Sequence, residues 1–141
     1  MPPEPPNAQA WNCFADVGRA LLVGSAVFAP LWRRDTRTSF NALTAVLATS
    51  AGSKATKAFW RERRPNGENN KSFPSAHAGD CFAAAVSLHR SRGDLLGPLA
   101  IGLATAVSMA RVFSGKHHIA DVIAGSALGV VAAELAAELG T

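Results

Sequence analysis

The chain has 141 residues, about half of them apolar, so it is long enough for one domain with a buried core. The composition is rich in Ala, Leu, Val and Gly and lacks Tyr, which favours close approach between helices. The net charge of +4 comes partly from a basic cluster at 54–64, and the two cysteines, Cys13 and Cys81, match no metal-binding spacing.

The chain begins with a Pro-rich, acidic stretch, MPPEPPNAQA, that lacks the basic region of a cleaved signal. We expect residues 1–10 to form a disordered lead-in and residues 11–141 to form a single domain. The first predicted helix covers Trp11–Trp32, with Pro30 bending or ending it. After the RRDTR loop, a second predicted helix covers Ser39–Trp60.

A polar loop with Pro, Gly and Asn follows, and Ser75 then provides a good N-cap for a third helix that reaches about Arg90. The SRGD loop leads to a fourth helix over Leu95–Val112, which ends near the Gly115 turn. A fifth helix extends from His118 to Leu139. No strand-like alternation is present, so we predict an all-α fold, a compact bundle of about five helices.

Three of these helices, the first, fourth and fifth, are long and apolar enough to cross a hydrocarbon core of about 30 Å. Lys54 and Lys57 shorten the apolar part of the second helix. The third, at about 14 residues, would be only about 21 Å long and cannot span alone. We therefore predict a membrane-embedded bundle, with a soluble helical bundle as the alternative.

Charge distribution predicts the orientation of such a bundle. If the chain crosses the membrane five times, the basic RRDTR and HRSRGD loops fall on the same side, which is typical of the cytoplasm. The acidic N-terminus, the 61–74 loop and the FSGKH turn fall on the other side. We expect a bacterial inner or plasma membrane protein whose active site faces the periplasm or the exterior.

The segment from Arg111 to Asp121 carries the first candidate catalytic group. His117 and Asp121 are four residues apart, so at the start of a helix they lie on one face. The carboxylate could fix one imidazole nitrogen and leave the other free to attack an electrophile. Arg111, across the short FSGK turn, could bring a guanidinium group to the same place.

Two further segments supply groups that suit a phosphate. Lys57 and Arg64 add cations, and guanidinium groups match phosphate oxygens with paired hydrogen bonds. Ser75 and Ala76 lie at a predicted helix N-terminus, where free N–H groups favour anions. His77 lies in the same turn and could donate a proton to a leaving oxygen. Asp80, three residues later, is a weaker candidate for tuning His77.

Together these segments resemble the three-part signature of the type-2 phosphatidic acid phosphatase (PAP2) superfamily, K-x6-R-P, P-S-G-H and S-R-x5-H-x3-D. Two positions depart from it: Ala76 replaces Gly and keeps its backbone N–H, and Ala110 replaces Ser and loses a hydroxyl. The residues that match are Lys57, Arg64, Pro65, Pro74, Ser75, His77, Arg111, His117 and Asp121.

The resemblance implies a metal-independent phosphatase with no cofactor. His117 would attack phosphorus and form a phosphohistidine, His77 would protonate the leaving group and then activate water, and Asp121 would orient His117. The phosphate would be held by Lys57, Arg64, Ser75, Ala76 and Arg111. The expected substrates are phosphatidic acid, phosphatidylglycerol phosphate or a polyprenyl (pyro)phosphate, with no nucleic acid partner.

Other functions remain open at this point. A soluble phosphomonoesterase of the same superfamily is the main alternative. A vanadate-dependent haloperoxidase would share the anion pocket, although such chains are much longer. A metal-dependent phosphohydrolase would need adjacent His and Asp ligands, which the chain lacks between His117 and Asp121. A non-enzymatic basic module would depend on the RERR run at 61–64 alone.

Overall fold

The computed structural model describes residues 3–92 and 94–140. Within these ranges the chain forms five helices and no strand, apart from one isolated bridge between Glu62 and Lys71. This confirms the predicted all-α fold. Gly93, in the predicted SRGD loop, lies outside the described residues. The helices are α1 (Ala8–Trp32), α2 (Thr36–Phe59), α3 (Ala76–Arg92), α4 (Leu96–Phe113) and α5 (Ile119–Leu139).

Two helices begin earlier than the sequence predicted. The first, α1, starts at Ala8 rather than Trp11, and Ala8 is buried, so the extended lead-in is shorter than expected. The second, α2, starts at Thr36 rather than Ser39 because Asp35 caps it. The Asp35 carboxylate accepts a hydrogen bond of 3.0 Å from the Thr38 N–H.

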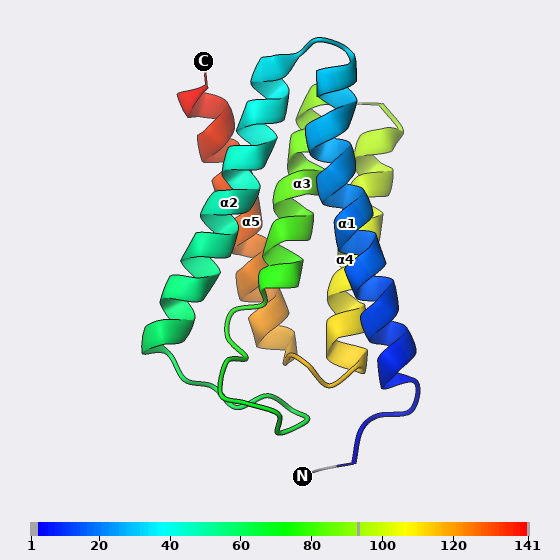
Figure 1. Cartoon of the computed structure of the whole chain (residues 1–141), viewed down its shortest axis with the longest axis vertical. Helices are drawn as coiled ribbons and strands as arrows, with labels where there is room; N and C mark the ends of the chain where they lie inside the picture. The colour runs from blue at the N-terminus through cyan, green and yellow to red at the C-terminus, as the bar shows by residue number, and fades with distance from the viewer. Residues whose placement is uncertain (1–2, 93, 141) are drawn as a thin grey trace.

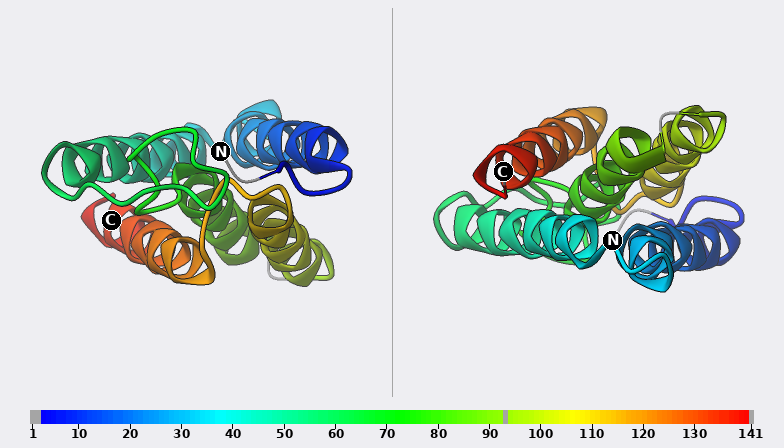
Figure 2. Two further views of the ribbon diagram at one scale, coloured as in Figure 1. Left: turned by 90° about the horizontal axis from the view of Figure 1, so that it is seen from below. Right: turned by 90° about the horizontal axis from the view of Figure 1, so that it is seen from above.

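The central helix of the bundle is α3, which packs against all four other helices (Figures 1 and 2). Its buried side chains are mostly Ala, and Gly79 and Asp80 also lie in the interior. Small side chains let the neighbouring backbones come close. A helix that is enclosed in this way does not have to satisfy the apolar requirements of a span that contacts lipid.

A face of α5 that carries Gly125 and Gly129 packs against α3 within the chain. A Cβ added at Gly125 would collide with the Ser75 carbonyl oxygen, and one added at Gly129 would collide with the Gly79 carbonyl oxygen. Glycine at these two positions therefore sets the spacing between α3 and α5. It also brings the start of α5 next to the start of α3.

The outer surface of the bundle is apolar. Large apolar side chains such as Trp32 (92% exposed) and Leu139 (88% exposed) face outward from α1, α2, α4 and α5. By length and composition, α1, α4 and α5 can each cross a membrane. These are the three helices that the sequence predicted to do so.

The connections that carry the candidate residues gather at one end of the bundle (Figure 1). The 60–75 loop, the α4–α5 turn and the described N-terminal residues lie there, while the α1–α2 turn and the end of α5 lie at the other end. The fold thus brings together the three segments in which the motifs occur.

Candidate active site

A tight turn between α4 and α5 places His117. Gly115 adopts a φ of 70°, a conformation that glycine reaches without strain. The N–H groups of Lys116 and His117 both donate to the Arg111 carbonyl oxygen, at 3.1 and 3.2 Å. These bonds fold the turn back on the end of α4. His117 is 2% exposed, so its imidazole lies inside the protein.

His117 and Asp121 face each other as predicted, but the direct hydrogen bond between them is missing. His117 Nδ1 lies 3.5 Å from Asp121 Oδ2, an ion-pair distance, and Nδ1 has no hydrogen-bond partner. The Asp121 carboxylate instead accepts hydrogen bonds from the Ser72 hydroxyl and from the His118 N–H. No local pattern in the sequence indicates a role for Ser72, which lies 49 positions from Asp121 in the chain.

Main-chain bonding connects the second motif to the third. Ser75 is fully buried, and its N–H donates to the Asp121 carbonyl oxygen at 2.9 Å. The Ser75 hydroxyl accepts from the Ala78 N–H at 3.4 Å, as expected for the residue preceding α3. The start of α3, with Ala76, therefore lies beside the start of α5.

Three cations from two of the motif segments act on His117. Burial is the largest cause that lowers the pKa of His117 below its ordinary value, and Arg64, Arg111 and Lys57 add to it in that order. Asp121 opposes them. The imidazole is therefore held in its neutral form, in which a ring nitrogen carries a free lone pair.

Both arginines are partly anchored and keep donors for another ligand. Arg111 is 7% exposed, and its Nη1 donates to Asn12 Oδ1 at 2.9 Å, while its buried Nε has no partner. Arg64 Nε donates to Asn69 Oδ1 at 3.0 Å. Lys57 is half-buried in the last turn of α2. A buried unpaired guanidinium donor beside a neutral imidazole suits an anion.

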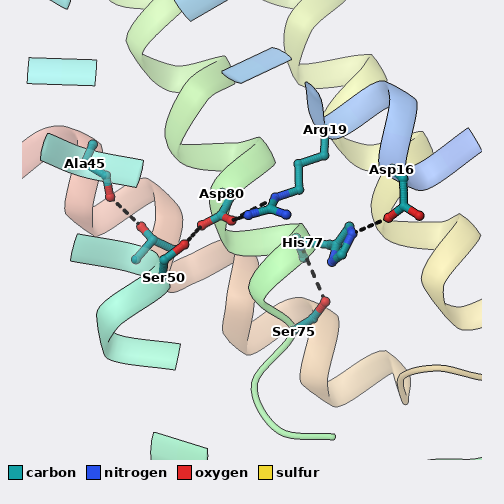
Figure 3. Close-up of polar contacts among 9 residues, drawn as sticks. Asp16, Arg19, Ala45, Ser50, Ser75, His77 and Asp80 are labelled. Atoms are coloured by element: carbon teal, nitrogen blue, oxygen red, sulfur yellow. Dashed lines mark hydrogen bonds and ion pairs between the residues drawn. The ribbon is translucent and has the colours of Figure 1, made fainter. Parts of the chain in front are cut away.

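His77 has an acidic partner that the sequence analysis missed. Its Nε2 lies 2.7 Å from Asp16 Oδ1, and Asp16 comes from α1 (Figure 3). The expectation that Asp80 tunes His77 is wrong. The Asp80 carboxylate accepts from Arg19 Nε (2.9 Å), Arg19 Nη2 (2.5 Å) and Ser50 Oγ (2.9 Å). A charged pair on an otherwise apolar α1 was the available signal.

The remaining histidines and the cysteines lie outside this arrangement. His118 Nε2 contacts the Arg63 carbonyl oxygen at 3.1 Å, and His89 is exposed near the end of α3. Cys13 is exposed and Cys81 is buried, and neither forms a disulfide. Across residues 3–92 and 94–140, no three His, Cys, Asp or Glu side chains are grouped as metal ligands would be. The charged side chains that act on His117 are three cations and the single carboxylate of Asp121.

The model of the PAP2 superfamily matches residues 38–139 of the sequence. The chain belongs to the PAP2 superfamily. The match covers α2 from its third residue to α5, including all three motifs, and leaves the whole of α1 outside.

Two characterised PAP2 relatives are similar over about half of the chain. This chain is 31% identical over 75 residues to a lipid A 1-phosphatase of Porphyromonas gingivalis. The aligned region covers 51% of this chain and 17% of the relative. This chain is 36% identical over 69 residues to a decaprenylphosphoryl-5-phosphoribose phosphatase of Mycobacterium tuberculosis. That aligned region covers 49% of this chain and 37% of the relative. The chain therefore matches well under half of the length of either relative.

Two solved structures share the PAP2 fold. LpxE of Aquifex aeolicus superposes with a TM-score of 0.80 at 17% identity, covering 97% of this chain and 88% of that one. A transmembrane PAP2-type phosphatidylglycerolphosphate phosphatase from Bacillus subtilis gives a TM-score of 0.72 at 22% identity, covering 94% and 75%. The five-helix arrangement, including α1, is thus common to these proteins.

Proposed function

We propose that this protein hydrolyses a lipid phosphate or pyrophosphate through a phosphohistidine formed on His117. The observation that carries the proposal is the buried imidazole of His117, whose pKa is lowered by burial and by cations of two separate segments, Arg64 and Lys57 from one and Arg111 from the other. Phosphoryl transfer spreads negative charge over three equatorial oxygens, and fixed cations stabilise that charge. The names of the two sequence relatives, both phosphatases, support the same chemistry.

In the first step, a lone pair of His117 attacks phosphorus while the bond from phosphorus to the leaving oxygen breaks. Because Nδ1 faces Asp121, Nε2 is the nitrogen left to attack. The positive charge that develops on the ring is stabilised by the Asp121 carboxylate. The backbone N–H of Ala76 and the Ser75 hydroxyl, at the start of α3, would add donors to the phosphate oxygens.

His77 completes the cycle by moving protons. It gives its proton to the leaving alkoxide or phosphate in the first step. It then removes a proton from a water molecule, whose oxygen attacks the phosphohistidine. Cleavage of the phosphorus–nitrogen bond returns His117 to its neutral form and releases inorganic phosphate.

The membrane assignment follows from the apolar exterior and the three helices that can span a bilayer, α1, α4 and α5. A site at one end of such a bundle lies at headgroup level, where a lipid can present its phosphate while its tail stays in the bilayer. The arginines of the α1–α2 turn and of the end of α3 lie at the opposite end, which favours that end as cytoplasmic. The site would then face the periplasm or exterior. The substrates that we propose are phosphatidic acid, phosphatidylglycerol phosphate or a polyprenyl (pyro)phosphate.

A phosphate-release screen tests the proposal. It compares these lipids with p-nitrophenyl phosphate, using the wild-type chain, His117→Ala and the matched control His89→Ala. We expect His117→Ala to lose roughly 10³-fold or more of turnover because the attacking nitrogen is gone. His89→Ala should keep its activity, and vanadate should inhibit the wild type competitively.

Retained turnover in His117→Ala would refute the nucleophile assignment. Activity that disappears in excess chelator would instead indicate metal-dependent hydrolysis. Release from p-nitrophenyl phosphate alone, by a chain that purifies without detergent, would favour the soluble phosphomonoesterase.

A further inference from the structure

The first helix, α1, carries a stripe of three polar side chains that reaches the site, although α1 lies outside the matched PAP2 region. Asn12, Asp16 and Arg19 are spaced by four and three residues, so they lie on one face of the helix. Asn12 contacts Arg111, Asp16 contacts His77 and Arg19 contacts Asp80. Such polar groups on an otherwise apolar helix are costly unless they have a function.

We propose that Asp16 is a positioning residue that holds His77 in the orientation and protonation state of a general acid. The inference rests on the proposed function, because it concerns proton transfer to the leaving group of the same reaction. It adds to the PAP2 motifs a carboxylate that comes from outside them.

The geometry assigns different tasks to the two nitrogens of the His77 ring. Nε2 lies 2.7 Å from Asp16 Oδ1, which is hydrogen-bond distance, and the His77 side chain is 20% exposed. With Nε2 donating to Asp16, Nδ1 is the nitrogen left to give a proton to the leaving oxygen. The Asp16 carboxylate also stabilises the protonated ring that must be present before that step.

The ion pair between Arg19 and Asp80 prevents Asp80 from acting as the partner of His77. Asp80 lies on the same helix as His77, three residues further on, and is fully buried. Arg19 and Ser50 together satisfy Asp80, and Figure 3 shows the Arg19 guanidinium lying between Asp80 and the His77 ring. Because Arg19 directs Nε and Nη2 to Asp80, the carboxylate that remains for His77 is Asp16.

The charges around His77 make Asp16 necessary. Burial is the largest cause that lowers the pKa of His77 below its ordinary value, and Arg111 from α4 and Arg19 from α1 lower it further. Asp16 from α1 opposes this shift through its hydrogen bond and its charge. Lys57 of α2 and Asp121 of α5 act on His117. Without Asp16, the imidazolium would face two cations and no partner.

The decisive experiment compares two leaving groups in Asp16→Asn. An alkyl phosphate ester needs a proton on its leaving oxygen, whereas p-nitrophenolate leaves well without one. We expect kcat/KM on phosphatidic acid, which reports the step that forms the phosphohistidine, to fall roughly tenfold or more, and kcat/KM on p-nitrophenyl phosphate to change little. The basic limb of the pH profile on phosphatidic acid should move to lower pH by about one unit, because the acid loses its proton more readily.

Two further variants separate positioning from folding. Asp16→Glu keeps a carboxylate and should restore part of the loss. Glu134→Gln makes the same acid-to-amide change on α5, in a half-exposed ion pair with Arg90 of α3, and should match the wild type on both substrates. Thermal unfolding in detergent should give similar midpoints for Asp16→Asn and the wild type.

The outcomes are distinguishable. Equal losses on both substrates with an unmoved pH profile would overturn the role of Asp16 and leave the phosphatase assignment standing. An Asp16→Asn variant with wild-type kinetics would do the same. Absence of phosphate release by the wild-type chain from every substrate would refute the proposed function, and this inference with it.

Discussion

At His117, burial and charge act in the same direction on the protonation equilibrium. The side chain is almost fully enclosed, and Arg64, Arg111 and Lys57 all disfavour a further positive charge there. The Asp121 carboxylate acts in the opposite sense but does not compensate for them. The proposed nucleophile therefore keeps a free lone pair over a wider pH range than an ordinary histidine.

A pH profile tests this conclusion. Because the pKa of His117 is lowered from its ordinary value of 6.5, protonation should abolish attack only at a pH well below 6.5. The acid limb of kcat/KM, corrected for ionisation of the substrate, should therefore lie below that value. Replacing Arg64 by Gln removes one of the cations and should move the limb toward higher pH. A limb near 6.5 in the wild type would contradict the burial argument.

Local spacing predicted part of this chemistry and missed the rest. The separation of four between His117 and Asp121 places them on one helix face in any helix, so the sequence was sufficient for that pair. Asp16 and Ser72 reach their partners across 61 and 49 positions, and no periodic pattern encodes such contacts. Only the packing of α1 against α3, and of the loop against α5, brings them together.

Among the elements, the pair α3 and α5 sets the geometry of the site. Ser75 precedes α3, and its N–H bonds to the main chain of Asp121 in the first turn of α5. Gly125 lies against the Ser75 carbonyl group, so the spacing of the two helices and the position of the serine are set by the same contact. A change in the spacing of α3 and α5 at this contact would therefore displace Ser75 within the site.

Substitution of Gly125 by Ala tests this coupling. The added methyl group would collide with a backbone carbonyl oxygen, which cannot move as a flexible side chain can. We expect a loss of about 1–3 kcal/mol in the free energy of unfolding, together with reduced phosphate release. Gly102→Ala in α4 is the matched control, because its methyl group meets nothing within 4 Å. Equal stability of the two variants, measured by unfolding in detergent, would show that α3 and α5 tolerate a wider spacing.

The existence and type of the helices followed from sequence, whereas some of their ends did not. Ser75 is a strong signal for the start of a helix, and Gly115 is a strong signal for a turn. The boundaries of α3, α4 and α5 near these two residues lie within one residue of the predictions. The starts of α1 and α2 were placed too late. Asn7 precedes α1 with a positive φ and no side-chain cap, so no capping signal marks that start. Asp35, the cap of α2, lies within the polar RRDTR stretch, which reads as a loop in the sequence.

At the scale of the whole molecule, the polar site at one end and the apolar exterior suit the proposed lipid substrate, which has a charged headgroup and an apolar tail. The 60–75 loop and the α4–α5 turn form one end, and large apolar side chains surround the bundle between the ends. The third helix appeared too short to span in the sequence analysis. The structure resolves this difficulty by enclosing α3 among the other four helices.

Membrane fractionation tests the assignment at this scale. The exposed apolar surfaces of α1, α4 and α5 predict that the protein stays in the membrane pellet after washes with high salt and with alkaline carbonate. Detergent should release it. Recovery of most of the protein in the soluble fraction after cell lysis without detergent would contradict a spanning bundle and favour a water-soluble one.

The enclosure of α3 also bears on how the protein is assembled. In the described chain, α3 presents no large apolar side chain to the outside, and its interior carries the carboxylate of Asp80. Such a segment has little affinity for lipid by itself, and it needs Arg19 of α1 as a partner on one side and the glycines of α5 on the other. The segment that bears Ser75 and His77 therefore depends on both of these helices for its position, so the site is complete only when they are assembled around α3.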